Sequence, residues 1–152
     1  MDKHILLKLK ITPKLVNAPK YLECYFTLPP EGMVLFSCDG ASKGNPGKAR
    51  WGFVIREHTG KILGAMAGGL GTSTNYVAEL KAIVEAMKNA KEMQLKTIWI
   101  RTDSEAAAKV CNKGNIHWLF KSEFERLKSE FTWLLITSTW REINFSADAC
   151  AN

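Results

Sequence analysis

The chain has 152 residues, 46% of them hydrophobic, and a formal net charge of +6. This length and composition are typical of one globular domain with a sizeable core. No stretch approaches the roughly 20 apolar residues of a membrane-spanning helix. The four cysteines contain no CxxC pair, which argues against a zinc site or a disulfide framework. We therefore expect an intracellular protein that does not bind membranes. Its expected location is the nucleus or the cytoplasm, with an organelle as an alternative, and it is expected to be a monomer.

The positive charge is spread along the chain. Residues 1–30 hold five lysines and two acidic residues, and the remaining half of the net charge lies in residues 31–152. Such an excess suits a nucleic-acid partner, but solubility explains it equally well. Prolines at 13, 19, 29 and 30 interrupt the first segment, although ILLKLKI alternates like a strand. We predict a basic tail or linker over residues 1–30 and a domain over 31–152.

From residue 34 onward, apolar periodicity predicts an α/β domain. Strand patterns cover VLFSCD, WGFVIRE, KILGAMAGG, LKTIWIRTDS and WLLITSTW. A first helix is predicted to begin after Thr74-Asn75, and a short second helix is predicted to follow Ser104, which caps it. A third helix is predicted from a stripe of phenylalanines, and SADACAN resembles a last helical turn. Three successive strands followed by helix-connected strands predict a mixed sheet flanked by helices. The expected core stripes are Val77, Leu80, Ile83, Val84 and Met87 on the first helix, and Phe120, Phe124, Leu127 and Phe131 on the third.

A glycine-rich stretch, residues 41–47, follows the first strand and is expected to form a turn. It lacks the Gly-Lys-Ser/Thr of a P-loop, and no helix opens there as a dinucleotide site requires. The aspartate before the stretch, Asp39, is therefore its most informative residue.

Four acidic residues hold positions that topology could bring together. Asp39 and Asp103 lie where two strand patterns end, Glu79 lies early in the first helix, and Asp148 begins the last one. Carboxylates that close repel one another, and Mg²⁺ shared between them would relieve the repulsion. Taken singly, each has an ordinary explanation: Asp103 as a turn or cap residue, Glu79 as a solvated helix residue, and Asp148 as a helix-dipole partner.

Four motifs, DGASKGNPG, TNYVAELKAI, IRTDS and REINFSADACA, together resemble the ribonuclease H family over residues 31–152. The likeness is greatest to the domains of plant retrotransposon reverse-transcriptase polyproteins. It implies a five-stranded mixed sheet, with strands 1–3 antiparallel and strands 4 and 5 parallel to strand 1, and an origin in a larger polyprotein.

The resemblance also implies an activity and a metal site. Family members are endoribonucleases that hydrolyse the RNA strand of RNA–DNA hybrids with two Mg²⁺ ions, for which Mn²⁺ can substitute, leaving 5′-phosphate and 3′-hydroxyl ends. The family's catalytic, metal-binding carboxylates correspond to Asp39, Glu79, Asp103 and Asp148.

Substrate contacts are implied in the same way. Ser42, Gly44 and Asn45 would face the ribose of the RNA strand, joined by Asn75. Thr74 resembles the threonine that binds a DNA phosphate, and Ser104 is a further candidate RNA contact. A plain hairpin loop remains the alternative for residues 42–47.

Two features depart from the family pattern. Ser138 stands where many members carry a histidine that assists proton transfer or product release, and the long basic handle of some relatives is missing. We expect most of the five tryptophans to pack in the core or in grooves. Two alternatives stay open: a weakly active or non-catalytic nucleic-acid-binding module derived from a retroelement, and a resolvase- or integrase-type transferase on the same fold.

Overall fold

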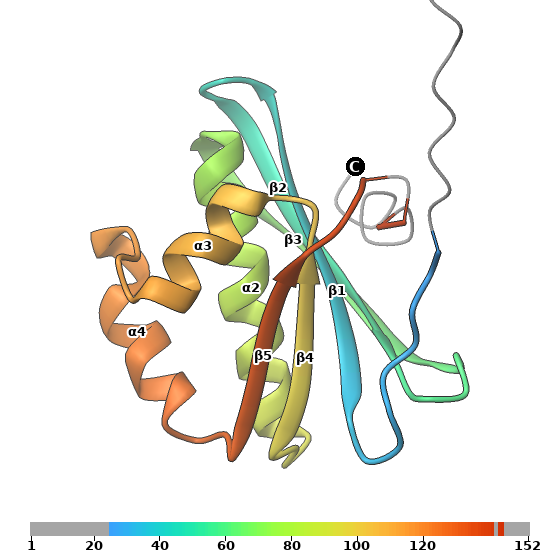
Figure 1. Ribbon diagram of the computed structural model, residues 1–152. Helices are drawn as coiled ribbons and strands as arrows, with labels where there is room; N and C mark the ends of the chain where they lie inside the picture. The colour runs from blue at the N-terminus through green and yellow to red at the C-terminus, as the bar shows by residue number, and fades with distance from the viewer. Residues whose placement is uncertain (1–24, 142, 145–152) are drawn as a thin grey trace, which may run out of the picture.

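The computed structural model describes residues 25–141, 143 and 144. Its five strands and three helices follow the predicted order (Figure 1), and no helix among these residues is long and apolar enough to cross a membrane. The elements are β1 (Val34–Gly44), β2 (Gly47–Arg56), β3 (Ile62–Ser73), α2 (Asn75–Glu92), β4 (Thr97–Thr102), α3 (Glu105–Lys113), α4 (Trp118–Lys128) and β5 (Trp133–Ser138). The predicted tail strand and last helical turn lie outside the described residues.

The strands form one mixed sheet in the order β3-β2-β1-β4-β5. β1 pairs antiparallel with β2, and β2 pairs antiparallel with β3. β4 lies parallel to β1 on its other side, and β5 lies parallel to β4. The predicted mixed α/β sheet is therefore confirmed, including the direction of every strand.

The main hydrophobic core lies between this sheet and the three helices, which all cover the same face (Figure 1). Both predicted helical stripes reach it: Leu80, Ile83, Val84 and Met87 of α2 are buried, and so are Phe120, Phe124 and Leu127 of α4, while Val77 and Phe131 pack at its margin. Alternate residues of the central strands complete the core, because successive strand side chains point to opposite faces.

The helix ends follow the signals in the sequence. Thr74 caps α2, its hydroxyl accepting a hydrogen bond from the amide of Val77 at 3.2 Å, and Ser104 caps α3 in the same way. Gly114 ends α3 in the left-handed conformation, at φ 75°. Each cap satisfies backbone groups that the helix itself leaves without partners.

The turn expected over residues 41–47 is much shorter than predicted. β1 continues through Gly44 and pairs with β2 up to Gly44↔Gly47, so only Asn45 and Pro46 connect the strands. The small residues indicated a loop, but backbone pairing with β2 continues along β1 beyond Asp39, so these residues belong to the strand. The glycines serve the tight connection: Gly44 has φ 87°, and a Cβ on Gly47 would lie 1.8 Å from the Lys43 carbonyl oxygen.

The expectation for the tryptophans is wrong for most of them. Trp51 is buried at 8% exposure and Trp99 is half-buried, but Trp118 is 78% exposed and Trp133 and Trp140 are each 59% exposed. These three lie at the start of α4, on the edge strand β5 and just after it. Composition alone does not distinguish an interior tryptophan from one at the rim.

Gly40 permits a close contact between β1 and α2. A Cβ at Gly40 would lie 2.2 Å from the carbonyl carbon of Ala78 and 2.3 Å from the amide nitrogen of Glu79. No side chain fits in that space, so the backbones of strand and helix touch. Asp39 precedes the contact on the strand and Glu79 lies on the helix opposite, so the contact fixes their separation.

Replacing Gly40 with alanine should therefore force strand and helix apart. We expect a loss on the order of 1–3 kcal/mol in the free energy of unfolding, the usual cost of overpacking. Chemical denaturation of the purified variant measures it. Gly69→Ala is the matched control, because a Cβ at Gly69 meets nothing within 4 Å. Equal losses in both variants would contradict the role assigned to Gly40.

Candidate active site

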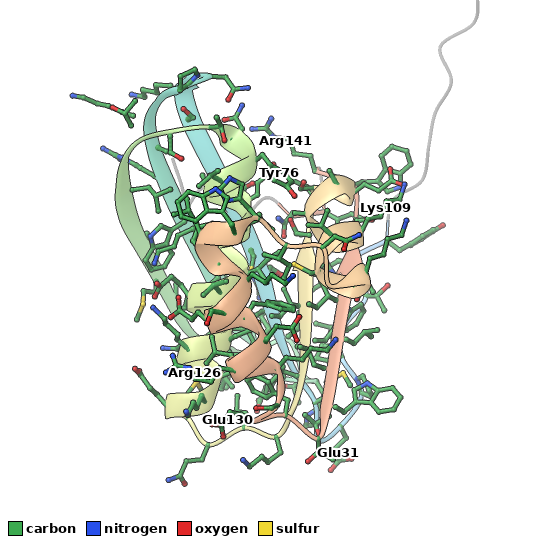
Figure 2. The ribbon with its side chains drawn as sticks, turned by 90° about the vertical axis from the view of Figure 1, so that its left-hand side faces the viewer. Glu31, Tyr76, Lys109, Arg126, Glu130 and Arg141 are labelled. Carbon is green, nitrogen blue, oxygen red and sulfur yellow. The ribbon has the colours of Figure 1, made fainter. Side chains whose placement is uncertain are left out.

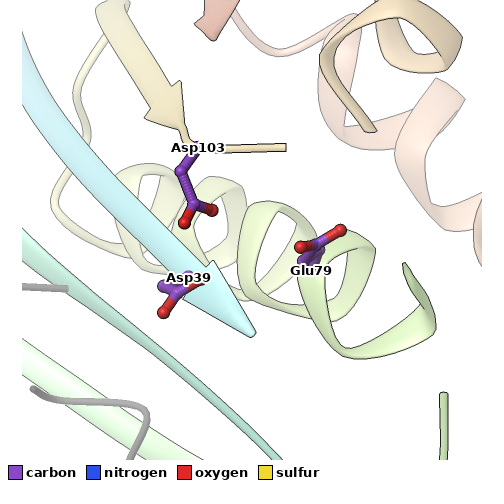
Figure 3. A group of neighbouring side chains, drawn as sticks. All are labelled: Asp39, Glu79 and Asp103. Atoms are coloured by element: carbon purple, nitrogen blue, oxygen red, sulfur yellow. The ribbon is translucent and has the colours of Figure 1, made fainter. Parts of the chain in front are cut away.

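Three of the four acidic residues meet at one end of the sheet (Figure 3). Asp39 comes from β1, Glu79 from the second turn of α2, and Asp103 follows the last residue of β4. One carboxylate oxygen from each lies within 4.8 Å of the other two. β1 and β4 are neighbours, with Cys38 opposite Thr102, so the next residue on each is an aspartate. The fourth acid, Asp148, lies outside the described residues.

Part of the cluster is shielded from solvent. Asp39 is only 4% exposed, and the Oδ1 atom of Asp103 is buried with no hydrogen-bond partner among the described residues. Burial raises the pKa of Glu79 above its ordinary value; a hydrogen bond with Ser104 opposes this, and the nearby charge of Asp103 adds to it. The three carboxylates therefore destabilise one another when all are ionised.

This donor set fits a hard divalent cation. Mg²⁺ is bound by carboxylate oxygens and retains several waters, so a site with three converging carboxylates and one unsatisfied oxygen suits it. A bound cation would also favour the ionised form of Glu79, whose pKa is raised chiefly by burial and further by the charge of Asp103. The residues that would hold it here are Asp39, Glu79 and Asp103.

Hydrogen bonds join the end of β1 to the start of α2 beside the carboxylates. The Asn75 side chain accepts a bond from the Ser42 amide at 2.7 Å, and the Asn75 amide donates to the Asn45 side chain at 3.1 Å. The Ser42 hydroxyl lies within hydrogen-bonding distance of the Ser73 carbonyl, at 2.9 Å, and of the Gly44 carbonyl, and its single proton serves one of them at a time. The structure thus brings together Ser42, Gly44, Asn45 and Asn75, all predicted as substrate contacts.

The other two predicted substrate contacts, Thr74 and Ser104, use their hydroxyls to cap helices. Thr74 and Ser104 each accept a bond from a helical amide, at 3.2 and 3.1 Å. Ser104 lies beside the cluster, where it also bonds to Glu79. Because Thr74 caps the start of α2, it also fixes the position of Asn75, the first residue of that helix.

A hollow of about 310 Å³ opens over the cluster, lined by the three carboxylates, Gly40, Ala41, Ser42, Asn75 and Arg141. Arg141 was not among the predicted site residues, although it lies within the REINFSADACA motif. It follows β5, and Figure 2 shows it at the end of the molecule opposite Glu31 and Glu130. Asp103 also borders a second hollow of about 480 Å³, lined by Ser138 and Trp140. Ser138, where the family pattern led us to look for a histidine, is the last residue of β5, and a basic residue three positions after it was the available signal for Arg141.

Residues 37–152 match the family described as reverse transcriptase-like. The chain belongs to this family, whose domains are of the ribonuclease H type. A putative ribonuclease H protein of Arabidopsis thaliana is 33% identical over 125 residues, which is 80% of this chain and 20% of that protein. The chain spans between about a fifth and a half of the length of the curated relatives that it matches first.

Solved ribonucleases H1 share the fold. The enzyme of the archaeon Halobacterium salinarum superposes with a TM-score of 0.73 at 30% identity, covering 79% of this chain and 95% of that one. LC11-RNase H1, solved in complex with an RNA/DNA hybrid, has a TM-score of 0.67 at 27% identity, covering 79% and 93%. The ribonuclease H-like fold predicted from the motifs is therefore confirmed.

The raised pKa of Glu79 predicts a stability effect of definite sign. A carboxyl group whose pKa is higher in the folded state destabilises the fold as pH rises from its unfolded value through the folded one. Glu79→Gln removes that penalty and keeps an oxygen for Ser104. We expect the variant to be more stable than the wild-type chain at pH 7 without divalent ions, and the difference to vanish below about pH 4.

Thermal unfolding at several pH values, with and without Mg²⁺, measures this. Mg²⁺ should stabilise the wild-type chain and have little effect on Glu79→Gln. Glu92→Gln, an exposed substitution near the other end of α2, should change neither property. A Glu79→Gln chain less stable than wild type at neutral pH would show that the repulsion is already compensated.

Proposed function

We propose that this chain is an endoribonuclease that hydrolyses the RNA strand of RNA–DNA hybrids. The observation that carries the proposal is the convergence of Asp39, Glu79 and Asp103 under an open hollow, with an Asp103 oxygen that the described part of the chain leaves without a hydrogen bond. Structural carboxylates are normally hydrogen-bonded or paired. Such an oxygen, beside two other acids, suits a metal-dependent reaction better than a purely structural role.

The reaction proposed is a two-metal hydrolysis, with Asp39, Glu79, Asp103 and Asp148 as the ligands. Mg²⁺ or Mn²⁺ at such a site supplies an activated water and stabilises the leaving oxygen, which gives 5′-phosphate and 3′-hydroxyl ends. Asp39, at the end of the central strand β1, would be the carboxylate shared between the ions. The close contact at Gly40 would keep Asp39 and Glu79 in place to hold them.

Recognition of the RNA strand is assigned to the end of β1 and the start of α2. Ser42 and Asn75 line the same hollow as the carboxylates, and Asn45 is bonded to the Asn75 amide. Small side chains and exposed backbone allow a sugar to approach closely, and a 2′-hydroxyl both donates and accepts hydrogen bonds. Arg141, lining the hollow, is suited to contact a phosphate oxygen of the substrate.

A weakly active or non-catalytic binding module is the second candidate. Ser138 supports this second candidate, because it stands where many relatives have an assisting histidine. Ser138 lines the hollow beside Asp103. Steady-state cleavage of a labelled hybrid with Mg²⁺ separates the two proposals, with single-stranded RNA and duplex DNA as substrate controls. Hybrid binding without cleavage would favour the module.

Asp39→Asn should abolish cleavage while leaving the fold intact. Removing a charge that both ions share should lower the rate by roughly 100-fold or more, comparable to losing one preorganised charge-stabilising group. Single-turnover cleavage measures the rate and circular dichroism checks the fold. Glu92→Gln is the matched control and should cleave like wild type. If Asp39→Asn retains most of the activity, Asp39 is not a metal ligand.

The proposed basic tail predicts a salt effect. Replacing Lys3, Lys8, Lys10, Lys14 and Lys20 with glutamine in the full chain should weaken hybrid binding at low salt. Each lost phosphate contact should reduce the slope of log affinity against log salt by roughly 0.7–0.9. Fluorescence anisotropy across a salt series measures that slope. An unchanged slope would exclude the tail from the interface.

A further inference from the structure

The face of the sheet opposite the helices carries an unusual buried charge. Arg101 of β4 is only 3% exposed, and its Nη1 atom has no hydrogen-bond partner among the described residues. A buried guanidinium normally pairs with a carboxylate, because desolvating a charge is costly. None of the ion pairs formed by the described residues includes Arg101.

Two aromatic rings and one carbonyl hold the Arg101 guanidinium instead. It lies 4.3 Å from the ring centroid of Trp99 and 5.1 Å from that of Phe26. Its Nη2 atom donates to the Thr27 carbonyl. Cation–π contacts of this kind are strongest where water is excluded. Trp99 in turn donates from Nε1 to the Thr137 hydroxyl at 2.8 Å, which joins β4 to β5.

The segment before β1, residues 25–30, therefore lies across this face and contacts strands on both sides of β1. Phe26 also lies 5.5 Å from the Arg56 guanidinium of β2. Leu28 reaches the hairpin between β2 and β3, where its methyl carbons lie 3.5 and 3.6 Å from the position of a Cβ on Gly60. Pro29 is buried. Residues 25–28 themselves remain exposed, Phe26 at 38% and Leu28 at 39%, so the segment lies over the sheet through these few contacts.

The register places Arg101 directly beside the carboxylate site. Ser37 of β1 lies opposite Arg101 on one side and Val54 on the other, so all three share a face. Two residues further along β1, about 7 Å away, is Asp39. Two residues beyond Arg101 is Asp103, which lies between the end of β4 and the Ser104 cap of α3. Whatever fixes Arg101 thus fixes the strand end from which Asp103 projects.

We propose that Phe26, acting through Arg101, is a positioning residue for Asp103, so that the functional unit begins before residue 31. The Phe26 ring and the Thr27 carbonyl clamp the Arg101 guanidinium near the end of β4, from the face that the helices do not cover. The clamp itself stands on the described contacts; its consequence for metal binding rests on the proposed function. Without the Phe26 ring, the guanidinium loses one of its two aromatic contacts, and the end of β4 keeps its pairing with β1 and β5 but loses its contact across the open face of the sheet.

The test uses full-length variants and two readouts. Phe26→Leu keeps an apolar side chain but removes the ring face, and Phe26→Tyr restores the ring. Leu28→Ala is the matched control, because it loosens the same segment at the hairpin and leaves Arg101 untouched. The first readout is amide hydrogen exchange without metal at Ser104 and Thr139, which donate to the Thr102 hydroxyl and carbonyl at 3.2 and 2.8 Å. The second is calorimetric titration with Mn²⁺.

We expect Phe26→Leu to speed exchange at both amides and to weaken Mn²⁺ binding by roughly threefold to tenfold, within the range of a desolvated cation–π contact. Phe26→Tyr should match wild type in both readouts. Leu28→Ala should lower the melting temperature without either effect. If Phe26→Leu behaves like Leu28→Ala, the segment only stabilises the fold and the proposal is overturned. If the wild-type chain binds no Mn²⁺ but Phe26→Leu still exchanges faster at these amides, the metal site is refuted and the clamp is supported.

Discussion

The close contact between the backbones of β1 and α2 is the constraint on which the candidate site depends. Gly40 leaves no room for a side chain between them, and the helix begins where the Thr74 cap directs it. The strand then brings Asp39, and the helix Glu79, to the same end of the sheet. Because the parallel neighbour β4 ends beside them, Asp103 reaches the cluster directly after its strand.

The resulting cluster illustrates how a fold can hold an unfavourable arrangement of charge. Burial, and to a smaller extent the charge of Asp103, oppose ionisation of Glu79 and raise its pKa. Packing elsewhere sustains the arrangement: the core stripes of α2 and α4 are deeply buried, and ion pairs such as Lys88–Glu123 and Lys91–Glu130 reach from α2 to α4 and the residues just after it. Local destabilisation at the end of a well-packed sheet is typical of functional sites.

The two faces of the sheet contribute differently. The helical face supplies most of the apolar burial and therefore most of the stability. The opposite face carries Arg101, Trp99 and the segment around Phe26, where cation–π contacts and single hydrogen bonds join three strands. The first face holds the sheet together, and the second restrains the strand end next to the carboxylates. The three exposed tryptophans lie at the margins, at the start of α4, on the edge strand β5 and just after it.

The sequence by itself determined the order of the elements, the faces of the helices, the caps at Thr74 and Ser104, and the identity of three converging acids. These follow from local periodicity, from capping chemistry and from motifs whose residues are close in the chain. The tertiary structure decided the rest. Pairing with β2 turned an expected loop into the last residues of β1. The exposure of Trp118, the place of Arg141 in the hollow, and the bond from Arg101 to Thr27 across 74 residues depend on which distant segments pack together. Periodicity specifies which face a side chain takes, but it carries no information about the partner that the rest of the chain brings to that face.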